Sequence, residues 1–424
     1  MPHLTAVILA AGRSSRFGQR HKALPEPWGV GLLAKAASIF KALGLERIVV
    51  VTGFRAEEVA TVAQNLGLAS VFNANFDQGM LSSVQTGLKA IEEGAALILP
   101  VDAAFVSPWA VLAVIEKWLA LPAADHKMAL ITPVYNGQTG HPPIWGPEVI
   151  KEVLAGEDNP RAILARLMPE AFGQGFLQGL APIEAPLTGP IRFVDLPDPG
   201  VLCDIDTQAD YERVLAQPAP ITPWPSPRQL WALLKLVGPG PRVEAHSLAV
   251  ARGALRLGVA LERVWPESGV DPQKGFLGGL IHDVDRLKKK HELEGQARLK
   301  ALGWPELAFI VGQHKDLTWP PKPPSPDEPD WLARPDIIQA SLAVYLADKY
   351  RLETKLVSLE DRFGLKIDSF TEPKARAKAL GRLENARKVE SWYLEKLGQY
   401  PNLVVGQRLN HPWESLADEL EGEF

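Results

Sequence analysis

Residues 7–18, Val-Ile-Leu-Ala-Ala-Gly-Arg-Ser-Ser-Arg-Phe-Gly, decide how the first half of this chain folds, together with Lys22. The apolar run stops abruptly and gives way to small, hydroxyl and cationic residues, as expected where a buried strand leads into a phosphate-binding loop. An ordinary turn can also place a glycine after a strand, but three cations so close to the strand end favour phosphate handling. Small residues let backbone N–H groups approach a polyphosphate, and cations neutralise it. The candidate nucleotide-binding residues here are Leu9, Ala10, Ala11, Gly12, Arg13, Ser14 and Lys22, with Arg16 beside them.

Length and composition limit the class of protein. A chain of 424 residues is too long for one core and predicts two or three domains. The net charge of −5 gives no basic field for nucleic acid, so we expect small-molecule substrates. Cys203 is the only cysteine, which excludes an internal disulfide and a cysteine-rich zinc site. Neither a membrane span nor a signal peptide is apparent, so we expect a cytoplasmic protein without a membrane partner.

Apolar strand-like runs alternate with helical patterns from residue 4 to about residue 217. This alternation predicts a Rossmann-like α/β domain with a mostly parallel sheet and helices on both faces. Ligands bind at the carboxyl ends of such strands, here the loop after the first strand and the region around Asp102. The expected strands are 4–10, 47–52, 69–73, 95–101 and 128–134, and the expected helices are 31–43, 55–66, 81–93 and 108–120.

Acidic residues after two of the apolar runs are candidate magnesium ligands. Asp102 follows a buried strand, where a carboxylate can hold Mg²⁺ against nucleotide phosphates. It could instead cap the next helix, although Ser107 before Pro108 is better suited to that role. Asp204 and Asp206 form a second acidic pair, for which metal binding and capping of the helix at 208–216 remain equal alternatives, Thr207 being another cap candidate.

Several segments of the first half, taken in order, resemble the MobA-like nucleotidyltransferases related to molybdenum cofactor cytidylyltransferase. Residues 9–22 look like the family signature, and Leu99-Pro-Val-Asp102 looks like its metal-binding segment. The family's closing acidic motif is similar to Asp204-Ile-Asp206-Thr207, whereas Ala104 stands where the family usually has proline. The other matching segments are Gln78-Gly79-Met-Leu-Ser82-Ser83, Gly140-His141-Pro-Pro143 and the partly matching stretch from Gly156 through Arg161.

The resemblance implies a reaction in which an acceptor phosphate attacks the α-phosphorus of an NTP and expels pyrophosphate. It implies catalytic roles for Arg16, Lys22 and Asp102, and Mg²⁺ binding by Asp102 with the later acidic pair. Ala11, where guanylyltransferases have a second glycine, points to CTP. The implied acceptor is molybdopterin or its molybdenum form, with a molybdoenzyme or cofactor-delivery protein as a possible partner, while a sugar or polyol phosphate is the alternative. Gly79 and Ser82 would bind the nucleotide, and His141 and Arg161 the acceptor.

A proline-rich stretch separates the halves. Residues 217–228 contain five prolines, which exclude a helix and predict a stiff connector. We therefore expect domains at 1–217 and 229–424, joined by a linker at 218–228. Helical patterns then predict an all-α second domain. The patterns cover 242–259, 292–302, 306–313, 336–350 and 374–397.

Histidines gather in the second half. Four of the nine (His246, His282, His291 and His314) lie within one stretch of 69 residues, and Asp283 follows His282 directly. A single buried histidine is usually a core residue, but this grouping with the distant Asp348 favours a site for Mn, Fe, Zn or Mg.

The order His246, His282-Asp283, Asp348 resembles the HD-domain phosphohydrolases, and His291 and His314 look like the extra ligands of members with two metals. The resemblance implies one or two divalent metals and hydrolysis of phosphate esters, with His282 and Asp283 as catalytic residues. Lys288, Lys289 and Lys290 could attract an anionic substrate or form a solvated turn. The alternative for this half is a nucleotide-sensing module that regulates the transferase without turnover.

Overall fold

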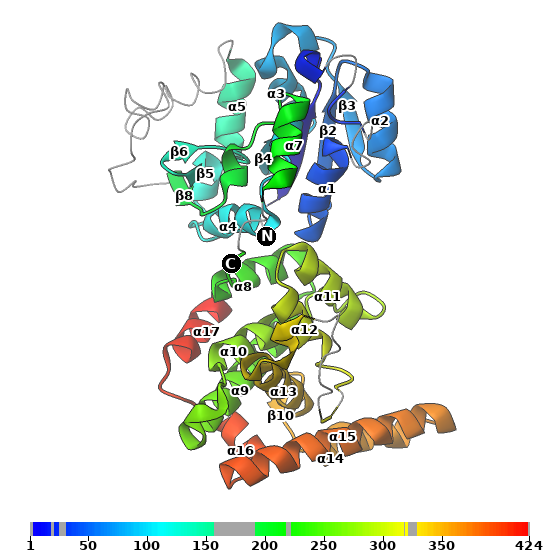
Figure 1. The fold of residues 1–424 in the computed structure, drawn as a ribbon, viewed down its shortest axis with the longest axis vertical. Helices are drawn as coiled ribbons and strands as arrows, with labels where there is room; N and C mark the ends of the chain where they lie inside the picture. The colour runs from blue at the N-terminus through cyan, green and yellow to red at the C-terminus, as the bar shows by residue number, and fades with distance from the viewer. Residues whose placement is uncertain are drawn as a thin grey trace. The chain divides into compact units, whose positions relative to one another are not determined.

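A computed structural model describes residues 3–17, 21–24, 31–156, 191–217, 222–317, 319–320 and 329–422. The chain forms two compact units, the first ending at Pro223 and the second starting at Trp224 (Figure 1). The first is an α/β domain with a mixed, largely parallel sheet, and the second is helical, as the sequence predicts. No helix in the described residues is both long and apolar enough to cross a membrane.

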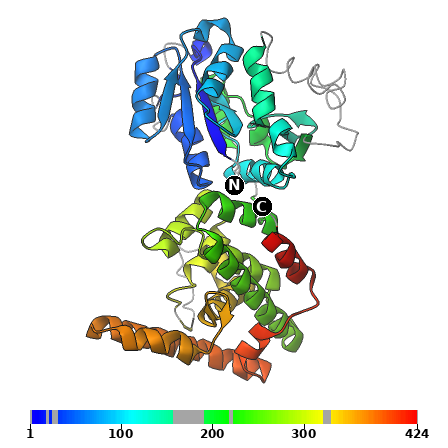
Figure 2. The same ribbon diagram turned by 180° about the vertical axis from the view of Figure 1, so that it is seen from behind.

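The first unit is built on an eight-stranded sheet with the order β3-β2-β1-β4-β7-β5-β6, in which β8 pairs with β5 (Figure 2). Strand β1 is buried throughout and pairs in parallel with both β2 and β4. Because every residue of β1 is covered, the run reads as continuously apolar instead of alternating. The strands are β1 (Leu4–Ala10), β2 (Ile48–Thr52), β3 (Ala69–Phe72), β4 (Ala95–Pro100), β5 (Leu130–Tyr135), β6 (Gln138–Thr139), β7 (Ile144–Trp145) and β8 (Ile191–Asp195).

The sheet differs from the expected one beyond β4. The two-residue strand β7 lies antiparallel between β4 and β5, and β6 is antiparallel to β5. Strands this short carry no periodic signal, so the sequence does not predict them. The five-residue strand β8 was not among the predicted strands either.

Helices cover the sheet. The helices α3 (Met80–Lys89) and α5 (Pro147–Ala155) share a core with β1, to which Val84, Val149 and Val7 belong. The helices α1 (Leu32–Ala42) and α4 (Pro108–Leu119) contact each other and pack against β1 and β5, respectively. The remaining helices are α2 (Ala56–Asn65) and α7 (Gln208–Ala216).

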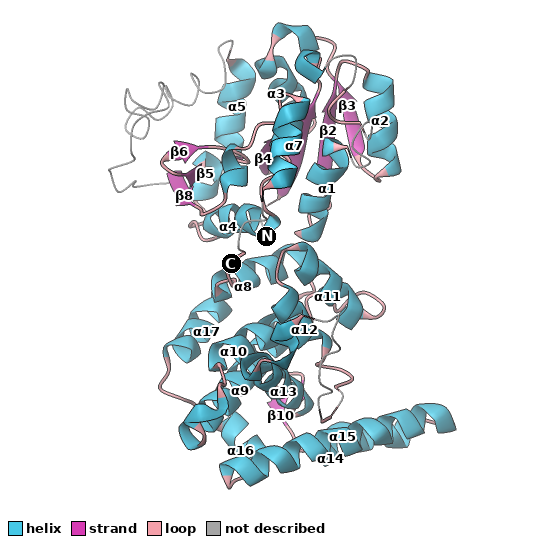
Figure 3. Cartoon of the chain, viewed as in Figure 1, coloured by secondary structure: helices cyan, strands magenta, loops and turns pink. Residues whose placement is uncertain are grey.

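The second unit is helical except for a short hairpin of β9 (Arg351–Leu352) and β10 (Lys355–Leu356) (Figure 3). Its centre is α9 (Pro241–Val264), against which α10 (Pro272–Ile281) and α13 (Pro335–Lys349) pack. The other helices are α8 (Pro227–Val237), α11 (His291–Ala301), α12 (Pro305–Gly312), α14 (Leu359–Ser369), α15 (Pro373–Leu397), α16 (Pro401–Gly406) and α17 (Pro412–Gly422).

Local sequence explains where these helices begin. Ser226 accepts a hydrogen bond from the Gln229 N–H and Pro227 occupies the first turn, so α8 starts where the proline-rich stretch ends. At the other end of the unit, a buried ion pair between Arg256 and Glu414 joins α17 to α9. The C-terminal segment is therefore part of the packed domain.

Candidate functional site

The first candidate site lies where β1 and β4 end. Their parallel register pairs Leu9 with Pro100, which brings the loop after β1 beside Asp102. A pocket of about 360 Å³ opens at this edge, where ligands of parallel sheets bind. It is lined by Leu9, Ala10, Ala11, Gly12, Ser14, Ser15, Arg16, His21, Lys22, Phe76, Gly79, Met80, Ser83, Pro100, Val101, Asp102 and Asp206.

Two carboxylates and two cations line this pocket, and a third carboxylate, Asp204, lies beside them. Ligand oxygens of Asp102, Asp204 and Asp206 lie within 4.8 Å of one another. The Lys22 ammonium is bonded to Asp102 and lies 3.8 Å from Asp206, which also pairs with Arg16. Desolvation, followed by the charges of Asp102 and Asp206, raises the pKa of Asp204 to about 6.

These residues fit a divalent cation. A carboxyl whose pKa is raised by neighbouring carboxylates gains from added positive charge, and oxygen ligands suit Mg²⁺. Thr207 caps α7 in a reciprocal pair with Asp210, so Asp206 is not the cap. Asp102 lies in a separate turn before α4, whose N-cap position is Ser107.

Two expected nucleotide-binding residues lie outside the pocket lining. Arg13 forms a two-pronged ion pair with Asp77, at 2.6 and 2.7 Å. Ser82 donates to the Asn75 and Gly79 carbonyls and so holds the turn before α3, whereas its neighbour Ser83 lines the pocket. Successive residues of a helix point about 100° apart around its axis, and the sequence motif does not show which of the two serines faces the pocket.

The two residues expected to bind the acceptor are placed differently. His141 donates its backbone N–H to the Val201 carbonyl and is not among the residues that line this pocket. A Cβ on Gly140 would stand 2.0 Å from that carbonyl oxygen, so only glycine fits there. Arg161 lies outside the described residues.

His21 is a pocket residue that the motif reading did not include. Burial lowers its pKa to about 4, so the ring is neutral at pH 7, and it stacks against Phe54. Its Nδ1 accepts a hydrogen bond from the Ala23 N–H. The one sequence feature that could have identified His21 is its position directly before Lys22. Its ring helps to hold the turn that carries this lysine.

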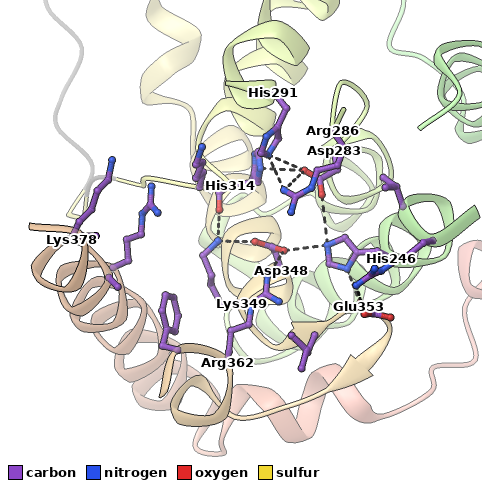
Figure 4. A pocket seen from close by; sticks show the side chains of 18 of the residues that line it. His246, Asp283, Arg286, His291, His314, Asp348, Lys349, Glu353, Arg362 and Lys378 are labelled. Carbon is purple, nitrogen blue, oxygen red and sulfur yellow. Dashed lines mark hydrogen bonds and ion pairs between the residues drawn. The ribbon is translucent and has the colours of Figure 1, made fainter. Parts of the chain in front are cut away.

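The second candidate site lies in the helical unit. Two groups of ligand atoms, His246-His282-Asp348 and Asp283-His291-His314, each lie within 4.8 Å of one another. The six residues come from the N-terminal part of α9, the end of α10, the start of α11, the turn after α12 and the end of α13. They border a pocket of about 580 Å³ (Figure 4), except His282, which is fully buried behind it.

Asp283 joins the two groups. Its Oδ2 lies 3.6 Å from His282 Nε2 and 4.0 Å from His246 Nε2. Its Oδ1 lies 3.2 Å from His291 Nε2 and 3.6 Å from His314 Nε2. One carboxylate therefore faces four imidazoles, a position from which it could bridge two cations.

Backbone carbonyls orient three of the imidazoles. The Nδ1 atoms of His246, His282 and His314 lie 2.7, 2.8 and 2.6 Å from the carbonyl oxygens of Glu353, Gly279 and Val311. Each Nδ1 therefore carries the proton, and Nε2 presents a lone pair to the centre. His282 Nε2 is buried without a hydrogen-bond partner in the described part of the chain.

Burial and the neighbouring charges set the protonation of these residues. Burial lowers the pKa of His282, and it lowers that of His314 to about 4, so both rings are neutral. Burial also opposes protonation of His246, but the hydrogen bond to Asp348 outweighs it and raises the pKa of this ring. Burial opposes ionisation of Asp283 as well, but the surrounding imidazoles and Arg286 outweigh it and lower the pKa of this carboxyl. Neutral imidazoles with ionised carboxylates suit a divalent metal, and the uncompensated His282 Nε2 is the observation that supports it.

The basic turn 288–290 does not face this pocket. Lys288 pairs with Asp285 at 3.0 Å, and none of the three lysines is among the residues that line the pocket. Arg286 is instead the basic residue of this region that lines the pocket, and it lies 3.5 Å from Asp283.

Comparison with known proteins concerns the first unit. Residues 6–171 match the MobA-like NTP transferase domain, which assigns a nucleotidyltransferase domain to this part of the chain. No curated protein matches.

Solved structures similar to about half of the chain include the following three. A nucleotidyl transferase from Methanothermobacter thermautotrophicus shares 21% identity over 50% of this chain and 95% of its own, with a TM-score of 0.39. The bifunctional IspDF of Campylobacter jejuni shares 16% identity over 50% of this chain and 54% of its own, with a TM-score of 0.35. CTP:phosphocholine cytidylyltransferase from Streptococcus pneumoniae shares 13% identity over 50% of this chain and 98% of its own, with a TM-score of 0.31.

Proposed function

We propose that the first unit transfers a nucleotidyl group, from CTP, to molybdopterin or its molybdenum form and releases pyrophosphate. The observation that carries the proposal is the grouping of Asp102, Asp204 and Asp206 with Lys22 at the pocket of the small-residue loop, which Asp102, Asp206 and Lys22 line. Ala11 in that loop supports CTP. The pterin acceptor is supported by the resemblance of the Gly140-His141-Pro142 segment alone, because His141 does not line this pocket.

Each residue of the first site would have a separate role in an in-line displacement. An acceptor phosphate oxygen bonds to the α-phosphorus while the bond to the β-phosphate oxygen breaks, so positioning and charge neutralisation matter most. The Ala10–Gly12 backbone would hold the phosphates, and Arg16 and Lys22 would stabilise the departing pyrophosphate. Asp102 with the acidic pair would hold Mg²⁺, which supplies charge neutralisation at phosphate oxygens when bound.

Pyrophosphate release tests this proposal. The protein is given each NTP with Mg²⁺ and either molybdopterin, molybdenum cofactor or a panel of sugar and polyol phosphates. We expect release with CTP and the pterin, and a loss of at least 100-fold in Asp102→Asn, because an amide cannot replace the carboxylate charge. Release with a sugar phosphate and none with the pterin would reject the acceptor.

For the second unit we propose a metal-dependent phosphohydrolase. The observation that carries this proposal is the pair of His/Asp groups sharing Asp283, with three imidazoles fixed by carbonyls. His246, His282 and Asp348 would hold one metal, and His291 and His314 a second, with Asp283 between them. Such metals, Mn, Fe, Zn or Mg, activate water and polarise a phosphoryl oxygen when bound. Arg286 would bind a phosphate oxygen.

Hydrolysis of p-nitrophenyl phosphate after loading with each metal tests the second activity. We expect His282→Ala to lose metal and hydrolysis while nucleotidyl transfer continues. A protein that binds metal and a nucleotide but hydrolyses no phosphate ester, and whose transferase rate changes with that nucleotide, would establish the sensing alternative instead.

A further inference from the structure

The pocket of the helical unit is larger than its His/Asp groups require. About 580 Å³ lies within the range of sites that enclose a drug-sized organic ligand. The wall formed by α14 and α15 is partly apolar, with Phe363, Ala375 and Ala379, and Phe370 between the two helices. The pocket is therefore suited to an organic ester and not to inorganic phosphate alone.

Its charge exceeds what a single phosphate needs. The lining has seven cationic side chains and three carboxylates. Two of the carboxylates, Asp283 and Asp348, are the candidate metal ligands, and the third, Glu353, pairs with Arg242. Metal ions at the ligands would raise the positive charge further. The seven cations are Arg242, Arg286, Lys315, Lys349, Arg362, Lys378 and Arg382.

Most of these cations have a carboxylate partner, as Lys315 does in Glu292 at 2.9 Å. Arg286, Lys349 and Arg362 approach the ligand carboxylates, at 3.5 Å from Asp283 for the first and at 2.7 and 3.9 Å from Asp348 for the others. Lys378, on α15, lies on the far side of the pocket from Asp283 and His246 (Figure 4).

Lys378 is held less tightly than its neighbour Arg382, although its charge adds to the Arg382 hydrogen bond in lowering the pKa of Asp316. It makes no hydrogen bond or ion pair with any residue in the described ranges, although it faces the pocket. One turn along α15, Arg382 also lines the pocket but is tied by two hydrogen bonds of 2.6 and 2.7 Å to Asp316. Lys378 is thus the far-wall cation that no hydrogen bond or ion pair within the described residues fixes in place.

We propose that the substrate of the helical unit is an organic phosphate with a second anionic group, and that Lys378 binds this group across the pocket from the metal ligands. The inference rests on the proposed phosphohydrolase activity. The scissile phosphate lies at the His/Asp groups beside Arg286, the apolar α14–α15 wall contacts the organic body, and Arg382 adds positive charge beside Lys378.

Matched alkane phosphonates test the proposal without knowledge of the natural scaffold. Alkane bisphosphonates of increasing length and monophosphonates of equal length are titrated calorimetrically into the metal-loaded protein. They are also used as inhibitors of p-nitrophenyl phosphate hydrolysis. We expect one bisphosphonate length to bind at least tenfold more tightly than its monophosphonate. Lys378→Ala should remove this preference and leave monophosphonate binding unchanged, and Lys378→Arg should keep it.

Lys374→Ala is the matched control, because Lys374 is an exposed lysine one turn earlier on α15 and does not line the pocket. It should leave the preference intact. Equal affinity for the two ligand series, or a preference that survives in Lys378→Ala, would overturn the proposal. Tighter binding of pyrophosphate than of every bisphosphonate would also overturn it. Absence of ester hydrolysis with intact bisphosphonate preference would reject the hydrolase and not the anion subsite.

Discussion

Replacing Asp283 by asparagine separates a metal-binding role from a purely structural one. The amide has the shape of the carboxylate, so the substitution opens no cavity, but it removes the charge that faces four imidazoles at 3.2–4.0 Å. Substitution of groups that merely support metal ligands costs about 10–100-fold in affinity. Because both His/Asp groups share this carboxylate, its loss should lower the metal affinity of each group by at least about 100-fold.

Metal content and thermal unfolding measure the effect. A metal present at about 100 times its Kd stabilises the fold by about 2.7 kcal/mol. For a unit of this size, 1 kcal/mol shifts Tm by about 2–4 °C, so EDTA should lower the metal-responsive transition by about 5–11 °C in the wild type. In Asp283→Asn, the protein should retain little metal after dialysis and EDTA should leave Tm nearly unchanged.

Asp285→Asn provides the opposite control. This buried carboxylate, two residues further on, pairs with Arg298 and Lys288 and does not belong to either His/Asp group. It should lower stability by about 3–5 kcal/mol through a broken buried ion pair, yet keep the metal content and the EDTA response. If Asp283→Asn binds metal as the wild type does, the site is not a metal centre.

Three further predictions concern other parts of the chain. Because the pKa of Asp204 is raised to about 6, protons compete with Mg²⁺ below that pH; calorimetry should show affinity falling between pH 7 and 5 and constant above pH 7, and a pH-independent affinity would exclude this carboxyl as a ligand. Glu414→Gln leaves the buried Arg256 guanidinium without its counter-charge and should cost about 3–5 kcal/mol in urea unfolding, whereas a cost below about 1 kcal/mol would contradict the packing of α17. In Gly140→Ala the new Cβ meets the Val201 carbonyl oxygen at 2.0 Å, so thermal unfolding should show a clear loss of stability, and an unchanged Tm would contradict the turn geometry.

The sequence predicts those parts of the fold that have a strong local signal. Strand β1 begins and ends at the predicted residues, since a fully buried strand is apolar at every position. Strand β7 was not predictable, because two residues have no period and its place depends on pairing with both neighbours.

The candidate sites also contain residues that a local sequence signal identifies and residues that it does not. Local motifs identify Gly12, Lys22 and Asp102, but whether Ser82 or Ser83 faces the pocket depends on the rotation of α3. Lys378 belongs to no sequence motif, so the sequence did not identify it as a pocket residue. It reaches the pocket because α15 packs beside elements distant in the sequence, and such contacts are decided by tertiary packing.

The separation of the two pockets bears on how the activities are related. Every residue that lines the first pocket belongs to the first unit, and every residue that lines the second belongs to the second. Among the described residues, neither lining includes a side chain of the other unit, so we expect that a substitution in one lining leaves the chemistry of the other site unchanged. The proposed hydrolysis of an organic phosphate would use residues of the helical unit alone, namely the shared carboxylate, the carbonyl-fixed imidazoles and the far-wall Lys378.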